Sequence, residues 1–190
     1  MNAEYPDETA IDPPRDSVDR EADAWLAELP GVDSGVEAAR MRLLRLARQS
    51  ERILSEIASR HGLTLGDWET LSVLRRSGAP YTMTPSDVMK ALKVTSGTVS
   101  VRLERLTQAG LVEPAGGTAD GRSRPVRLTS EGKRRWRAAT NMRMEFEEKL
   151  FRRALGMEQI EHLNGLLRAL MVEWETELGP PPRRADDRGD

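Results

Sequence analysis

Residues 84–129 read TPSDVMKALKVTSGTVSVRLERLTQAGLVEPAGGTADGRSRPVRLT, and this stretch decides the fold. Threonine and proline at its start, followed by apolar positions at helical spacing, predict a short helix that ends near Leu92. The pattern then predicts a second helix over 96–109, a strand over 111–113, a polar loop rich in arginine, and a return strand over 125–128. This order is that of a winged helix-turn-helix, so we predict a mainly α fold with a small β wing.

The predicted second helix has one apolar side and one polar side. Val99, Leu103 and Leu106 recur every three or four residues and are expected to face the core. The other side has no glutamate among its first residues, which is typical of a helix that approaches phosphates and base edges. The predicted DNA contacts there are Thr95, Ser96, Thr98, Ser100, Arg102 and Arg105. A solvated helix surface with capping hydroxyls is the alternative interpretation.

The loop between the two strands, GGTADGRSR over 116–124, is predicted to form the tip of the wing. Arg122 is expected to enter the minor groove of DNA, with its guanidinium held by Asp120. Arg124 is expected to contact a phosphate. The alternative is a hairpin tip that is only solvated.

Charge is unevenly distributed along the chain. The formal net charge is −2, yet eleven basic and four acidic residues lie between positions 90 and 137. A basic block within an otherwise acidic protein indicates a surface that binds a polyanion. A solvated charged surface is the alternative.

The rest of the 190-residue chain divides into helices and tails. The predicted segments are a disordered acidic tail (1–16), an extra helix and first dimerisation helix (17–62), the winged helix-turn-helix domain (63–130), C-terminal dimerisation helices (131–178) and a disordered tail (179–190). A capping box from Ser34 to Glu37 is predicted to start the first long helix. Apolar residues keep helical spacing along the long helices, which is typical of helices that pack on other long helices.

Composition argues against several classes of function. Without cysteine, the chain cannot form disulfides or zinc–thiolate sites. No apolar run approaches the roughly 18 residues of a membrane span, and no signal peptide is recognisable, so we expect a cytoplasmic protein with no membrane partner. His61 and His162 are the only histidines, and no phosphate loop, zinc motif or nucleophile elbow occurs. We therefore expect no enzyme activity, no catalytic residues, no metal and no cofactor.

Two motifs in this chain resemble the multiple-antibiotic-resistance regulator (MarR) family. They are L-x-x-L-x-x-A-G-L-V over 103–112 and D-G-R-S-R-P-V-R-L-T-S-E-G over 120–132, and the likeness extends over about 36–175. The resemblance implies a homodimer whose first and last long helices intertwine. It also implies that two recognition helices enter successive major grooves of a pseudo-palindromic operator, where the protein acts as a repressor.

The segment GLTLGDWETLSVLRRSGAPY over 62–81, preceded by a helix with a tryptophan, is similar to the urate-responsive branch of that family. In that branch a Trp, an Asp and two Arg surround an anionic, purine-like ligand. Trp25 and Arg102 match the Trp and the first Arg, whereas Glu69 stands at the Asp position and Pro114 at the second Arg position.

The resemblance thus implies a ligand set of Trp25, Glu69 and Arg102 that has lost one charge-assisted partner. A small ligand that is anionic or aromatic, a less anionic or different ligand, and no ligand at all stay open. Arg102 has two competing roles, as a DNA contact or as a ligand contact. The predicted function is a repressor relieved by a small molecule. The alternative is a winged-helix architectural or protein-interaction adaptor without a small-molecule response.

Overall fold

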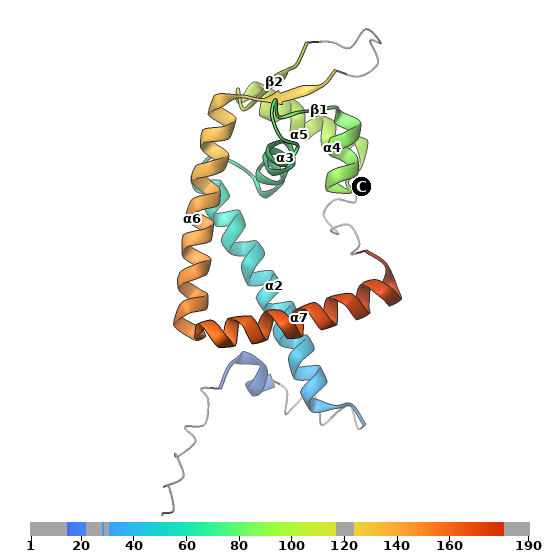
Figure 1. The fold of residues 1–190 in the computed structure, drawn as a ribbon, viewed down its shortest axis with the longest axis vertical. Coiled ribbons are helices and arrows are strands. Elements are labelled where there is room, and N and C mark those ends of the chain that lie inside the picture. The colour runs from blue at the N-terminus through green and yellow to red at the C-terminus, as the bar shows by residue number, and fades with distance from the viewer. Residues whose placement is uncertain (1–14, 22–27, 29–30, 117–123, 181–190) are drawn as a thin grey trace, which may run out of the picture. The chain divides into compact units, whose positions relative to one another are not determined.

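The computed structural model describes residues 15–21, 28, 31–116 and 124–180. They belong to two compact units, Met1–Arg52 and Ile53–Asp190. The described secondary structure is helical apart from one three-stranded sheet (Figure 1). Within these residues, none of the helices combines the length and the apolar content needed to cross a membrane.

The first unit contains a short helix joined to the long helix α2 by arginines. Residues 17–21 are helical, and α2 runs over Ser34–Arg60, past the unit boundary. Arg42 donates to Asp16 at 2.8 Å and to Asp19 at 2.5 Å, and Arg45 donates to Ser17 at 2.5 Å. The hydrogen bond from Arg42 lowers the pKa of the Asp16 carboxyl well below its usual value. These contacts hold residues 16–19 on α2.

The N-terminal cap of α2 differs from the prediction. Asp33 Oδ1 accepts a hydrogen bond from the backbone N–H of Val36 at 2.9 Å, so Asp33 is the cap and Ser34 is already helical. The predicted capping box from Ser34 is therefore wrong. Glu37 instead pairs with Arg40 at 2.5 Å. Aspartate and serine cap helices equally well, and local sequence does not decide between adjacent capping residues.

Threonines begin the next three helices, in the second unit. The helices are α3 (Leu65–Arg76), α4 (Pro85–Leu92) and α5 (Ser96–Gln108), with Thr64, Thr84 and Thr95 as their caps. Each threonine side chain accepts from the backbone N–H three residues on. The predicted start of α4 is confirmed, and α5 is capped by Thr95. Lys93, with a left-handed φ of 57°, makes the turn between α4 and α5.

The sheet is small and antiparallel. Its strands are β1 (Thr82–Met83), β2 (Val112–Pro114) and β3 (Val126–Leu128), in the order β1-β3-β2. The two wing strands agree with the prediction to within one residue. The sequence pattern did not predict β1, because two residues are too few to show an alternation.

The core of the second unit contains the predicted apolar side of α5. Val99, Leu103 and Leu106 are all buried. They belong to one cluster with residues of α3, α4, the helix α6 (Ser130–Ala154) and the start and end of the wing. The cluster includes Leu71, Leu74, Val88, Leu111, Leu128 and Ala139. Burial of one such side chain contributes about 1.5–3 kcal/mol, so this cluster fixes which side of α5 faces outward.

Two tryptophans join α3 to α6. Trp68 Nε1 donates to Thr140 Oγ1 at 3.0 Å, and Trp136 Nε1 donates to Ser72 Oγ at 2.8 Å. Gly132 lets α6 begin against the end of α5, because a Cβ at this position would lie 2.1 Å from the carbonyl oxygen of Leu111. The start of α6 is thus fixed beside the wing (Figure 1).

Helix α7 runs over Met157–Leu178, and none of its residues is buried. Much of the apolar stripe predicted for α6 and α7 is exposed to solvent in the single chain. The exposed members of the predicted stripe are Met142, Phe146, Leu150, Leu170, Trp174 and Leu178, and further exposed apolar residues of these helices include Phe151, Leu166 and Val172. Apolar surface of this extent is typical of an interaction surface.

Candidate nucleic-acid interface

Hydroxyl groups line the outer side of α5. Thr95, Ser96 and Ser100 are exposed, and Thr98 is half-buried. Thr95 Oγ1 lies 2.9 Å from Thr98 Oγ1, and Ser100 Oγ donates to the carbonyl of Ser96 at 2.9 Å. The first turn of α5 has no acidic residue. This end of the helix therefore presents hydroxyl groups and the positive end of the helix dipole, which suit phosphates and base edges.

Val101 belongs to the same surface, although the sequence pattern did not single it out. It is 61% exposed. The sequence could have identified Val101 as exposed, because it falls outside the three-to-four spacing of the buried residues Val99 and Leu103. An exposed aliphatic side chain on such a helix suits contact with a thymine methyl group.

Arg105 turns from α5 toward the first turn of α3. Its Nε and Nη2 donate to Asp67 Oδ1 at 3.1 and 2.7 Å, and Nη2 also donates to Thr64 Oγ1 at 3.0 Å. Asp67 is only 4% exposed. The sequence did not reveal this pairing, because it joins residues 38 positions apart.

Arg102, one turn earlier on α5, also faces α3. Its Nη1 lies 3.5 Å from Glu69 Oε2, so the structure brings together two members of the predicted ligand set. The guanidinium lies directly over Gly66, where a Cβ would be 2.6 Å from Arg102 Cζ. Beside it is an open cleft of about 460 Å³, lined by Thr64, Gly66, Gly97, Thr98, Val101, Arg102 and Arg105.

Of the other positions in the predicted ligand site, only Pro114 belongs to the described residues. Trp25 lies outside the described residues. Pro114 is the last residue of β2 and pairs in register with Val126 of β3, so it belongs to the stem of the wing. The described part of the ligand set is therefore the Arg102–Glu69 pair.

The stem of the wing is the antiparallel pair β2 and β3. Arg127 of β3 and Glu113 of β2 face each other in the sheet and form an ion pair of 2.7 Å. Arg124 is exposed at the start of the return strand. The predicted tip residues Asp120 and Arg122 lie outside the described residues, so their roles stay predictions.

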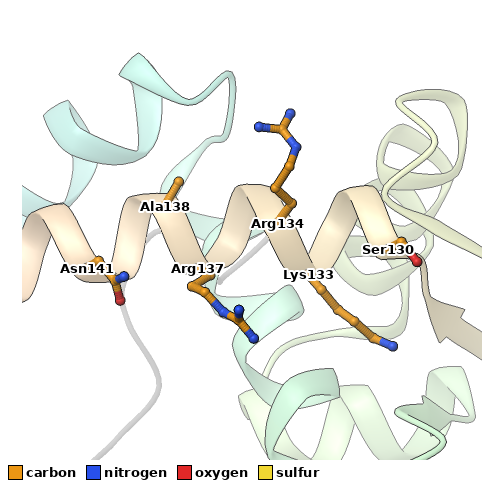
Figure 2. A pocket seen from close by; sticks show the side chains of 6 residues that line it. All are labelled: Ser130, Lys133, Arg134, Arg137, Ala138 and Asn141. Atoms are coloured by element: carbon orange, nitrogen blue, oxygen red, sulfur yellow. The ribbon is translucent and has the colours of Figure 1, made fainter.

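The basic block of the sequence continues onto α6. A shallow hollow of about 360 Å³ is lined by one side of that helix, at Ser130, Lys133, Arg134, Arg137, Ala138 and Asn141 (Figure 2). Arg134 is held by Glu131 at 2.7 Å, and Lys133 Nζ lies 4.4 Å from the centre of the Tyr81 ring. Hydrogen bonds from Arg134 and Arg135 lower the pKa of Glu131 to about 2. The structure thus divides the basic block between the α5–wing region and α6.

The sequence of this region matches a known family. Residues 61–123 match the sequence model of the MarR family. This segment is a MarR-family domain. The matched residues begin just before α3 and end in the wing loop, so they include the whole of α5. The match confirms the predicted family for this segment, and the fold described above is the predicted winged helix-turn-helix.

One curated relative of the MarR-family domain is PecS, an HTH-type transcriptional regulator of Dickeya dadantii. It is 34% identical over 108 residues, which cover 57% of this chain and 65% of PecS. The chain thus matches just under two thirds of the length of that relative.

Solved structures share the fold. A mutant of E. coli MarR in complex with operator DNA aligns with a TM-score of 0.56 and 24% identity, covering 68% of this chain and 91% of that one. AbsC, a MarR family transcriptional regulator from Streptomyces coelicolor, aligns with a TM-score of 0.62 and 21% identity, covering 76% and 97%. These similarities establish the fold.

Proposed function

We propose that this protein is a homodimeric, DNA-binding transcriptional regulator of the MarR type that represses from a pseudo-palindromic operator. The observation that carries the proposal is the division of α5. One side is buried at Val99, Leu103 and Leu106, and the other side is rich in hydroxyls and has no acid in its first turn. A helix of this kind beside an arginine-bearing β-hairpin suits a duplex with a major and a minor groove.

In the proposed complex, the first turns of α5 enter the major groove. Thr95, Ser96, Thr98 and Ser100 contact phosphates and base edges, and Val101 adds an apolar contact. The wing follows the backbone, with Arg122 in the minor groove, Asp120 beside it and Arg124 on a phosphate. The operator complex of E. coli MarR, which has a similar fold, supports this interpretation.

The proposed dimer joins two such domains through the exposed apolar residues of α6 and α7. Two recognition helices then meet half-sites about one helical turn of DNA apart, roughly 10 base pairs. This arrangement would cover the apolar residues of α6 and α7 that are exposed in the described part of a single chain.

A small anionic or aromatic molecule is proposed to relieve repression from the cleft beside Arg102. The distance of 3.5 Å between Arg102 and Glu69 exceeds the roughly 2.7–2.9 Å of a strong charge-assisted hydrogen bond. An anion in the cleft competes with Glu69 for the guanidinium. Because Arg102 is part of α5, the exchange couples ligand binding to DNA affinity.

The test is a fluorescence-anisotropy titration of the duplex upstream of the protein's own gene, repeated over a series of salt concentrations. Arg122→Ala is expected to weaken binding at least several-fold and to flatten the dependence of log K on log salt, because a cation that displaces counterions from the groove is lost. Lys149→Gln, which removes an exposed cation near the other end of α6, is the control. Unchanged binding by Arg122→Ala would contradict the wing assignment.

The same titration with urate, xanthine and a set of phenolic acids tests the effector. Release of DNA together with a shift in thermal unfolding is expected for at least one compound, and a silent panel would overturn the ligand response. Footprinting separates a regulator from an adaptor, because only a regulator protects discrete paired half-sites.

A further inference from the structure

The carboxylate of Asp67 is the centre of a buried polar cluster between α3 and α5. Its Oδ2 accepts from the backbone N–H of Thr64 at 2.9 Å and from Thr64 Oγ1 at 2.8 Å. Its Oδ1 accepts from Arg105 Nε at 3.1 Å and Nη2 at 2.7 Å. Both oxygens thus have two donors each, as a carboxylate that is only 4% exposed requires.

The cluster restrains α5 in more than one direction. Arg105 reaches Thr64 as well as Asp67, so its planar guanidinium has partners at the cap and at the first turn of α3. One turn away on α5, Arg102 lies over Gly66 of the same turn of α3. Two arginines of the recognition helix therefore contact one turn of another helix, which limits rotation and sliding of α5 beyond what apolar packing does.

We infer that Thr64, Asp67 and Arg105 form a positioning cluster that sets the orientation of α5 for base readout, and that Arg105 acts through α3. The inference rests on the proposed function. Direct readout requires side chains held to within about 0.5 Å and 10–20° of their productive geometry. Electrostatic attraction to phosphates is largely kept when the helix is misplaced, because it depends more on charge than on the exact position of each side chain. Loss of the cluster therefore lowers specific affinity and leaves non-specific affinity unchanged.

The test compares the operator with a scrambled duplex of equal length for Asp67→Asn, Arg105→Gln and the double variant. We expect the ratio of operator to scrambled affinity to fall roughly tenfold or more in each single variant, about the discrimination that one base contact supplies. The double variant should be little worse than either single variant, since both remove one unit. The salt slope of each variant should stay that of the unaltered protein.

Asp87→Asn is the matched control. Thr84 and Asp87 repeat the same cap at α4, with Thr84 Oγ1 donating to Asp87 Oδ2 at 2.7 Å. Among the described residues, the side-chain hydrogen bonds of Asp87 stay within this cap and do not reach α5. This variant should lose capping stability and keep the specificity ratio. Thr64 is exposed, so Thr64→Val and Thr64→Ser are milder changes. Serine keeps the hydroxyl that accepts from Arg105 and should keep the ratio of operator to scrambled affinity. Valine lacks the hydroxyl and should lower that ratio.

Thermal melting followed by circular dichroism gives the temperature range in which every variant is folded. Binding is measured within that range. An unchanged ratio in Asp67→Asn and Thr64→Val, with only a lower melting temperature, would overturn the positioning role. A salt slope reduced by about 0.9 in Arg105→Gln alone would also overturn it, because Arg105 would then be a phosphate contact. If the unaltered protein does not discriminate between the duplexes, the proposed function fails, and the inference with it.

Discussion

Gly66 leaves space for the guanidinium of Arg102, and the side chain of any other residue at position 66 would occupy that space. A Cβ at Gly66 would lie 2.6 Å from Arg102 Cζ and 2.7 Å from its Nε. These atoms belong to the end of a flexible side chain, so an added methyl group moves the guanidinium rather than the backbone. Gly66 thus decides where the guanidinium lies, and with it the 3.5 Å contact to Glu69.

Gly66→Ala should therefore separate the effector response from DNA binding. Alanine in a helix is favoured over glycine by about 0.5–1 kcal/mol. Weakening the contact between Arg102 and Glu69, whose side chains are 13% and 21% exposed, should cost about 1–3 kcal/mol. The two effects oppose each other, so the free energy of unfolding should fall by at most about 2.5 kcal/mol. Release of DNA by any active compound should be lost or strongly weakened. Chemical denaturation and the anisotropy titration measure the two quantities.

Gly165→Ala is the matched control for that prediction. An added Cβ meets nothing within 4 Å at Gly165 of α7, so this variant reports the helix preference alone. A full effector response in Gly66→Ala would show that the position of Arg102 does not matter to sensing.

At the scale of elements, α3 links α5 to α6. Toward α5 it presents charged groups at Asp67 and Glu69, and toward α6 it presents Trp68 and Ser72. Ser72 is 5% exposed and its hydroxyl also donates to the carbonyl of Trp68 at 2.7 Å. The two sides use different chemistry, so they can be perturbed separately.

Trp136→Phe should lower the free energy of unfolding by about 1–3 kcal/mol, because the indole N–H that bonds Ser72 is lost and the smaller ring packs less well. Ser72→Ala should cost a similar amount. A double-mutant cycle in urea unfolding should give a coupling of about 0.5–1.5 kcal/mol. Strictly additive effects would mean that the 2.8 Å contact does not contribute to stability.

For the whole molecule, the dominant feature is the apolar surface of α6 and α7, which is exposed to solvent in the described part of the single chain. On α7, Leu170 is 44%, Trp174 54% and Leu178 79% exposed. Each Å² of apolar surface in contact with water is unfavourable by about 25 cal/mol. We therefore expect two chains to associate through α6 and α7 and to bury this surface.

Leu170→Glu should convert the proposed dimer to monomer, because a dimer would bury an unpaired carboxylate in the centre of the stripe. Sedimentation velocity at micromolar concentration measures the change, and operator affinity should fall with it. Arg168→Glu adds the same group about 160° away round α7 and should leave the dimer intact. A monomeric unaltered protein, or a dimeric Leu170→Glu variant, would argue against this interface.

Local features of the sequence determined much of this protein. Thr84 followed by Pro85 marked the start of α4, and the spacing of Val99, Leu103 and Leu106 identified the buried side of α5. The wing strands and the family followed from motifs in the same stretch. These features depend on residues a few positions apart, where backbone preference and helical periodicity act directly.

Tertiary structure alone decided which partners the arginines of α5 have. Arg102 and Arg105 had the pattern of an outward DNA-contacting surface, yet their guanidinium groups lie on Glu69 and Asp67, 33 and 38 positions away. Only the folded chain brings the first turn of α3 against α5, and only glycine at position 66 leaves room for Arg102. Helical periodicity in the sequence shows which side of a helix is buried. The position of an arginine at the edge of that side depends instead on which acidic residue the neighbouring helix brings close to it.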